Sequence, residues 1–211
     1  MLQDEGEFQS ITAAHIRPFR TPQPTVLALA SQLPGKSVIE DLVTVFFSNI
    51  NWHYFILEKY YFDDLFSHWL GTAPRSIKYI SHEKLSQELE YFPALLFQII
   101  ALTVQFLPPD APVLGRLFHD EPVFSQKFSD IGEHLMTLLG REGATITAVE
   151  ADFLRSSWLK NFGRGIAAWH SLGNAIRLAS STPSLTRQRS NVPLQTSART
   201  RFVSTEQYSS I

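Results

Sequence analysis

The chain has 211 residues, of which 44% are hydrophobic and 12% aromatic, enough to bury one sizeable core without disulfides or metals. Its 18 Lys and Arg residues against 20 Asp and Glu residues give a formal net charge of -2, which disfavours autonomous binding to nucleic acid. The absence of cysteine excludes disulfides, thiolate metal sites and thiol nucleophiles, as is common in intracellular proteins.

The first 36 residues carry four prolines and follow neither the period of a strand nor that of a helix. We therefore expect residues 1–36 to be a partly ordered lead-in. The opening "MLQDEGEFQS" lacks the basic start and apolar run of a secretory signal, so export is not expected.

The first regular pattern begins near residue 39. Apolar residues follow the spacing of one helical face from Ile39 to Ile50. Ser37 is the expected N-cap of this helix, with Glu40 as its capping-box partner. The aromatic stretch "NWHYFILEK" then predicts a connector to the next helix.

A second, shorter helix is predicted from the apolar residues between Phe62 and Leu70, and Gly71 is expected to end it. Asp63 and Asp64 are placed at the start of this helix, where carboxylates favour the positive end of the helix dipole. That role explains the pair without any chemistry.

Residues 91–107 are 17 uncharged residues, the lower edge of what spans a bilayer. Gln98 and Gln105 lie seven residues apart, so both amides share one stripe opposite a wide apolar face. This arrangement favours a helix buried in a globular core, and no membrane association is expected. Pro93 is expected near the start, where a missing N–H costs little.

The long helix that contains this stretch is predicted from about residue 83 to 107. Glu88 and Glu90 fall in its first turns and are interpreted as ordinary exposed carboxylates. A further helical face follows between Phe124 and Leu138, with Gly140 and Gly143 at its end.

Two more helices are predicted at about 147–161 and 164–179. No alternating strand pattern of useful length occurs, so the sequence predicts an all-α fold, an irregular bundle of about six helices. Of the last 32 residues, 13 are Ser or Thr, and no apolar face continues. Residues 181–211 are therefore predicted to be a disordered Ser/Thr/Arg-rich tail.

The segment "NFGRGIAA" raises the question of a phosphate loop, because helix N-termini bind anions through free amides. It lacks the longer glycine-rich span and the Lys-Ser or Lys-Thr of a Walker loop, and no strand precedes it. We interpret Gly163 to Gly165 as a tight turn between two helices that pack antiparallel.

The two helices around this turn carry large apolar side chains at helical spacing, a pattern that usually marks a core. Gly173 is expected to let a neighbouring helix approach closely, and His170 is expected to point outward or to form a local hydrogen bond. The residues expected in the core are Trp158, Trp169, Leu172 and Ile176.

The best local cluster of metal-capable side chains is His119, Asp120 and Glu121. Successive residues rarely converge on one ion, and no H-E-x-x-H or similar spacing occurs, so a solvated loop is the preferred interpretation. No G-x-S-x-G elbow is present either. We therefore assign no catalytic, cofactor-binding, metal-binding or DNA-binding residue.

Three stretches together resemble the fungal-specific transcription factor domain, the middle homology region of binuclear zinc-cluster regulators. Residues 42–70, "LVTVFFSNINWHYFILEKYYFDDLFSHWL", look like its first helix, aromatic connector and Phe-led helix. Residues 88–112, "ELEYFPALLFQIIALTVQFLPPDAP", resemble its long apolar helix. Residues 152–180 resemble its "W-L-x-x-x-G-R" turn and the following "A-W-x-x-x-G-x-A-I-R-L-A" helix.

The resemblance implies a regulatory, non-catalytic domain over residues 37–180, in a nuclear protein that regulates transcription. The family's zinc cluster and its basic DNA-reading helix are missing, so no zinc cofactor is expected and DNA would be contacted only through a separate cluster domain. Partners are expected to be the same chain or related transcription factors.

The loss of helical periodicity at Ser180 suggests a truncated form of this domain. Such a truncation is expected to expose the apolar faces of Trp158 and Trp169 and to promote instability or self-association. Two alternatives stay open at this point. One is a small helical pocket protein or enzyme that binds an apolar small molecule, and the other is a fragment that pairs with a full-length paralogue.

Overall fold

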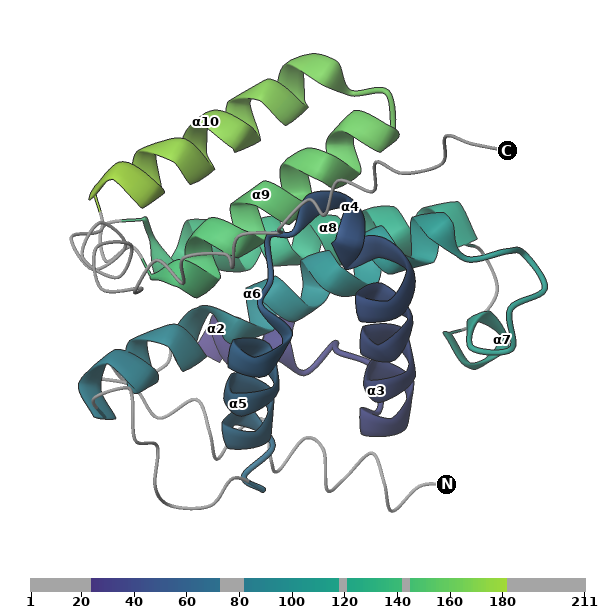
Figure 1. The fold of residues 1–211 in the computed structure, drawn as a ribbon, viewed down its shortest axis with the longest axis horizontal. Helices are drawn as coiled ribbons and strands as arrows, with labels where there is room; N and C mark the ends of the chain where they lie inside the picture. The colour runs from purple at the N-terminus through teal and green to yellow at the C-terminus, as the bar shows by residue number, and fades with distance from the viewer. Residues whose placement is uncertain (1–23, 73–81, 118–120, 142–144, 182–211) are drawn as a thin grey trace, which may run out of the picture.

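A computed structural model describes residues 24–72, 82–117, 121–141 and 145–181, and Figure 1 shows that these segments form a helical bundle. Every element among them is helical, which confirms the predicted all-α class. Six of the helices have ten or more residues. They are α3 (Lys36–Val45), α5 (Lys59–Trp69), α6 (His82–Phe106), α8 (Glu121–Leu139), α9 (Ile146–Asn161) and α10 (Gly165–Ser181).

The predicted lead-in ends in a helix that the sequence pattern did not predict. Helix α2 spans Pro24–Ala30 and begins with a proline, which is well suited to a first helical position. Val26 and Ala30 are buried, and Leu33 is buried just after the helix. Seven residues are too few to show a helical period, so packing against the bundle, rather than local pattern, stabilises this helix.

Helix α3 confirms the predicted apolar face but not its cap. Ile39, Leu42 and Phe46 are fully buried. Ser37 is not the N-cap, because the carbonyl of Gly35 already accepts from the N–H groups of residues 38 and 39, and no side chain caps the helix.

The expected connector after α3 is largely helical. A π-helical turn, η1 (Phe46–Ile50), continues α3 and leads into the single turn α4 (Asn51–Tyr54). The chain then reverses at Phe55, whose φ of 47° lies in the left-handed region. The Asn51 side chain holds this reversal, since its Nδ2 donates to the Leu57 carbonyl at 2.9 Å and its Oδ1 accepts from the Leu57 N–H at 3.3 Å.

Helix α5 begins earlier than predicted, so Asp63 and Asp64 lie in its interior rather than at its start. They do not interact with the N-terminus of the helix dipole. Asp63 pairs instead with Lys59 at 2.6 Å, and Asp64 lies 3.6 Å from His68, both at i,i+4 spacing. Gly71, with a φ of 69°, follows the helix end as expected.

Helix α6 is the centre of the bundle. It is long and apolar enough to cross a membrane, but 78% of its most hydrophobic window is buried against other elements, as in the core helix of a globular fold. Pro93 lies inside the helix and not near its start, so the carbonyl of residue 89 lacks its usual N–H partner.

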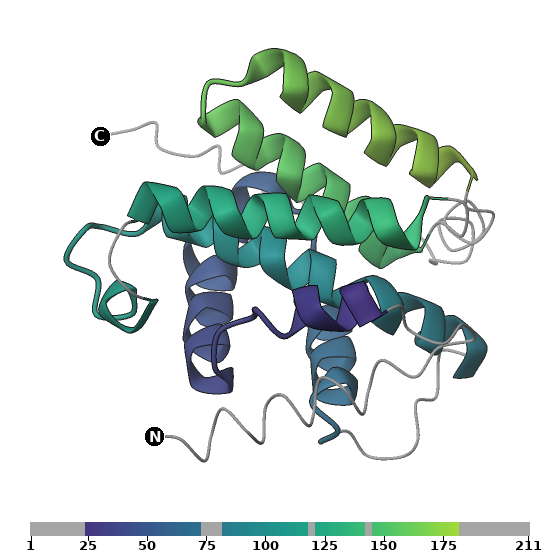
Figure 2. The same ribbon diagram turned by 180° about the vertical axis from the view of Figure 1, so that it is seen from behind.

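The other long helices form layers on α6. Helices α8 and α9 pack against α6 and against each other, and α10 packs on α9. Both views place α10 on the outside of the bundle (Figures 1 and 2). A short helix, α7 (Leu114–Leu117), precedes α8. Gly140, with a φ of 78°, ends α8 as predicted.

Some expectations concern residues outside the described segments. They include most of the predicted lead-in, Gly143, and the predicted tail except Ser181, which is the last residue of α10.

Candidate functional site

The most deeply buried carboxylate on α6 is Glu88, which is completely inaccessible. This corrects its interpretation as an exposed helix-start residue. Its Oε1 accepts from the Ile146 N–H at 3.2 Å, and its Oε2 accepts from the Thr147 N–H at 2.9 Å. Glu88 therefore caps the N-terminus of α9, where free amides and the helix dipole favour a negative charge.

The same helix start has a cap of its own. Thr145 is the N-cap of α9, and its Oγ1 accepts from the Ala148 N–H at 3.1 Å. Together, Thr145 and Glu88 satisfy the first three N–H groups of α9. The hydrogen bonds from these N–H groups explain why the Glu88 carboxylate can be buried in the core.

Two further ionisable groups lie beside this cap. Burial and the charge of Glu88 raise the pKa of Glu150 well above its usual value. Burial also raises the pKa of the Tyr61 hydroxyl, and the Glu88 and Glu150 carboxylates raise it further. Both shifts favour the uncharged forms of these side chains, so neither group is activated as a nucleophile.

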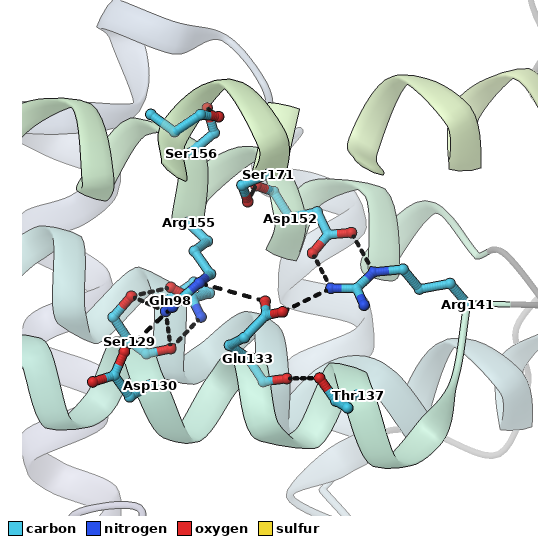
Figure 3. A network of polar contacts seen from close by, with 11 residues as sticks. Gln98, Ser129, Asp130, Glu133, Thr137, Arg141, Asp152, Arg155, Ser156 and Ser171 are labelled. Carbon is cyan, nitrogen blue, oxygen red and sulfur yellow. Dashed lines mark hydrogen bonds and ion pairs between the residues drawn. The ribbon is translucent and has the colours of Figure 1, made fainter. Parts of the chain in front are cut away.

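A second polar cluster joins α8 to α9 (Figure 3). Arg141 donates to both carboxylate oxygens of Asp152, from Nε and Nη2, at 3.1 Å each. Its Nη2 also donates to Glu133 at 3.1 Å. The Asp152 side chain is only 1% exposed, so this paired, bidentate geometry compensates for a buried charge.

The electrostatics of this pair follow from burial and pairing. Burial raises the pKa of Asp152, although the Arg141 guanidinium opposes that effect through its hydrogen bond and its charge. The hydrogen bonds that Arg141 donates to Asp152 hold the pKa of Arg141 above its usual value.

Arg155 completes the cluster on its other side. Its Nη1 donates to the Ser129 carbonyl at 2.6 Å and to the Ser129 hydroxyl at 2.8 Å, and it forms ion pairs with Asp130 and Glu133. Figure 3 shows that Arg155 and Arg141 reach Glu133 from opposite sides. The cluster therefore fixes how α8 and α9 pack, and each of its charges has a structural use.

The turn between α9 and α10 confirms the interpretation of Gly163 to Gly165. Gly163 has a φ of 77°, a conformation that glycine adopts without steric cost. Its N–H donates to the Lys160 carbonyl at 3.1 Å, and the Arg164 N–H donates to the Leu159 carbonyl at 2.9 Å. These are the two hydrogen bonds of a Schellman motif, which ends a helix and reverses the chain.

The face of α10 that packs on α9 consists mostly of small residues. Ser156 donates to the Ala168 carbonyl at 2.9 Å, and Ser171 donates to the Asp152 carbonyl at 2.9 Å, so two side-chain hydrogen bonds tie the helices together. Ala175 and Leu178 complete the buried face.

Of the residues expected in the core of these two helices, some are buried and others are exposed. Trp158 is fully buried and donates from Nε1 to the Ser125 hydroxyl at 2.7 Å. Trp169 and Ile176 are 74% and 57% exposed, so their assignment to the core was wrong, and Leu172 is half-buried. His170 is exposed, as expected.

The glycine that permits a close helix contact is not Gly173. A Cβ at position 173 would approach only the Arg177 side chain of its own helix. A Cβ on Gly132 of α8 would instead lie 2.4 Å from the Gln98 Nε2 and 3.2 Å from the Ala94 carbonyl. Sequence reasoning missed Gly132, because nothing local marks which glycine faces another helix.

A cleft of about 210 Å³ opens between α3, η1 and α5. Phe47 and Phe66 form its apolar lining, while Glu40 and the Lys59–Asp63 ion pair line its polar part. It is smaller than the range of about 300–1,000 Å³ that is usual for drug-sized ligands.

In the described segments, no three His, Asp or Glu side chains lie close enough together to hold a metal ion. The predicted cluster of His119, Asp120 and Glu121 is not covered by this statement, because the first two residues and the side chain of the third lie outside what the structure describes.

A family of known proteins matches most of the chain. The family described as "Fungal specific transcription factor domain" matches residues 43–204, from the end of α3 through α10 and beyond. The match extends past residue 180, where the predicted regulatory domain ended. No curated protein and no solved structure matches the chain.

Proposed function

The chain belongs to the family of the fungal specific transcription factor domain, and on this basis we propose that it is a regulatory, non-catalytic domain that acts in the regulation of DNA-templated transcription in the nucleus. The single observation that carries this proposal is the family match over residues 43–204, most of the chain.

The buried ionisable groups support a role without catalysis. Glu88 caps α9, and the Arg141–Asp152 pair and Arg155 hold α8 to α9. Catalytic acids and bases need a reacting group within hydrogen-bond reach. The hydrogen bonds of these side chains go to helix ends and to one another, as a scaffold for partner contacts requires.

Contact with DNA is proposed to come from a separate zinc-cluster domain and not from this sequence. The chain has no cysteine for a thiolate cluster, so no zinc cofactor is proposed for it. Its formal charge of -2 also supplies no net positive field for a phosphate backbone. In an electrophoretic mobility assay at physiological salt, the purified chain should leave duplex DNA unshifted.

The alternative is a small pocket protein or enzyme that binds an apolar molecule. Among the described residues, the cleft between α3, η1 and α5 is a candidate site, and its apolar lining of Phe47 and Phe66 favours this reading. Its volume of about 210 Å³ and the ion pair that lines it argue for a small and partly polar ligand at most. We therefore retain the regulatory function as the proposal.

The test is a fusion of the full chain to an unrelated DNA-binding domain in a fungal reporter strain. Reporter output should differ from that of the DNA-binding domain alone. The control fusion carries Trp158→Ala, which removes a fully buried side chain and should return output to that baseline. Unchanged output from a well-expressed fusion, together with an apolar molecule that copurifies with the chain, would favour the alternative.

A further inference from the structure

The outward face of α10 carries a regular stripe. Ile166, Trp169, Gly173, Ile176 and Ser180 follow alternating steps of three and four residues, the spacing of a helix seam that faces another helix. We call these five residues the α10 stripe. Ile166, Trp169 and Ile176 are 81%, 74% and 57% exposed.

Within the described part of the chain, this face has no covering element, since α10 is the outermost helix in both views (Figures 1 and 2). The three large side chains present roughly 400 Å² of apolar surface, the size at which a patch on a single chain commonly marks an interaction site. The opposite face of α10 is already occupied by α9.

We propose that the α10 stripe is a self-association surface, through which two copies of this chain pair antiparallel with Gly173 at the crossing point. The stripe is nearly symmetric about Gly173. Ile166 and Ser180 lie seven residues on either side of it, while Trp169 and Ile176 lie four and three residues away. A two-fold axis at Gly173 therefore places Trp169 of each copy against Ile176 of the other.

The glycine explains how the helices could approach. A Cβ at position 173 would meet only the Arg177 guanidinium, at 3.6 Å or more, so the fold itself does not require glycine there. Glycine within a helix costs about 1 kcal/mol relative to alanine. At the centre of a helix pair, a missing side chain lets two backbones come close.

Charge selects the antiparallel direction. Helix α10 contains no Asp or Glu, and Arg177 lies directly beside the stripe. A parallel pair would bring the two Arg177 side chains together. In the antiparallel pair they stand about 12 Å apart along the axis, beyond the Debye length of about 8 Å, and each lies near Trp169 of the other copy, where a cation–π contact is favourable.

Charge also favours a second copy over residues 182–211 as the occupant of the stripe. Those residues contain four Arg and one Glu, a net charge of 4 minus 1, or +3, and the exposed Arg164 and Arg177 of the same region are positive as well. If residues 182–211 covered the stripe, a positive segment would lie against a positive face. No two-fold register would then hold the charges apart.

The surface area that two copies would bury determines how tightly they should pair. Two copies would bury roughly 800 Å² from the large stripe residues, below the 1,200–2,000 Å² of a standard stable interface. The pair should therefore be weak and reversible, with a dissociation constant on the order of micromolar.

The first test is sedimentation equilibrium of the full chain. The mass should rise from 23.9 kDa toward twice that value across the micromolar range. Trp169→Glu should abolish this rise, whereas Trp52→Glu, at a 55% exposed tryptophan on α4, should not. A chain that stays monomeric throughout, or a Trp169→Glu variant that still pairs, would overturn the proposal.

The second test determines whether the two α10 helices pair antiparallel or parallel. The chain has no native cysteine that could form other disulfides. Ile166→Cys and Ser180→Cys chains are mixed and oxidised. An antiparallel pair gives the disulfide between the two variants, while a parallel pair gives Ser180→Cys homodimers and overturns the register. Shielding of Trp169 from acrylamide in a strictly monomeric chain would show that another part of the same chain occupies the stripe and would also overturn the proposal.

This inference does not rest on the proposed function. Both tests use purified chain and no reporter, so either proposal can fail while the other stands. Circular dichroism of each variant confirms that a loss of pairing is not a loss of folding.

Discussion

Gln98 and Ser129 exchange two hydrogen bonds across the interface between α6 and α8. The Gln98 Nε2 donates to the Ser129 carbonyl at 2.9 Å, and the Ser129 hydroxyl donates to the Gln98 Oε1 at 3.0 Å. Both residues are buried, so the pair satisfies polar groups that would otherwise be costly in the core. The contact depends on Gly132, which leaves room for the Gln98 amide.

Gly132→Ala should therefore destabilise the fold by about 1–2 kcal/mol. The new Cβ would lie 2.4 Å from the Gln98 Nε2 and 3.2 Å from the Ala94 carbonyl, so the amide must leave its place and the helices must separate slightly. Urea unfolding followed by circular dichroism measures the change.

Gly173→Ala is the matched control for this substitution. It makes the same change within a helix, but its Cβ meets only a flexible Arg177 side chain. It should stabilise the chain by about 0.5–1 kcal/mol when measured at a concentration too low for association. Equal effects of the two substitutions would show that helix propensity, and not the Gln98 contact, decides the outcome.

Glu88→Ala should cost about 3 kcal/mol, because it leaves the N–H groups of Ile146 and Thr147 buried without an acceptor and removes a favourable charge from the start of α9. Glu58→Ala is the control, since Glu58 is exposed at the start of α5 and its side chain forms no capping hydrogen bond. Its effect should stay within about 0.5 kcal/mol. Similar losses for both variants would contradict the capping role of Glu88.

The free energy of unfolding should depend on pH through the titration of Glu150. Burial and the Glu88 charge raise the pKa of Glu150 in the folded chain well above 4.5, so the folded state holds this proton more tightly than the unfolded state does. The stability that this proton contributes is fully present below about pH 4.5 and is lost as the pH rises through the folded pKa.

Glu150→Gln isolates that contribution, because glutamine has a similar shape and does not titrate. The difference in unfolding free energy, variant minus native chain, should grow in favour of the variant as the pH rises above about 4.5. Chemical unfolding at a series of pH values measures it. A difference that does not change with pH would mean that Glu150 is not held in its protonated form beside Glu88 and Tyr61.

The long helices were predictable because an apolar period is a local property of the sequence. The face of α3 and the turn at Gly163 follow from residues within one or two helical turns of each other. Trp158 and Trp169 show the limit of this reasoning. Both fit an apolar helical face, but only Trp158 meets another helix, and the period does not say which faces find a partner.

The candidate site was not predictable for the same reason. Glu88 has the local sequence of an exposed helix start, and its burial depends on amides 58 and 59 residues further along the chain. Asp152 likewise looks like an ordinary surface residue until Arg141 folds back onto it. Long-range contacts decide whether these charges lie in water or in the core.

The contribution of the buried Arg141–Asp152 ion pair to the free energy of unfolding can be measured by substitution. Arg141→Met should destabilise the fold by about 3 kcal/mol, because it leaves the Asp152 carboxylate, only 1% exposed, without its counter-charge. Arg116→Met is the control, since its ion pair with Asp41 is largely exposed, and it should cost no more than about 1 kcal/mol.

The double variant Arg141→Met/Asp152→Leu decides between two accounts of this loss. If the cost of Arg141→Met comes from the unpaired carboxylate, replacing that carboxylate as well should recover most of the stability. If the double variant is instead as unstable as the sum of the two single variants, the charges do not act as a pair, and the loss comes from packing around each side chain. Urea unfolding of all four chains at neutral pH gives the coupling free energy directly, and we expect it to exceed about 1 kcal/mol.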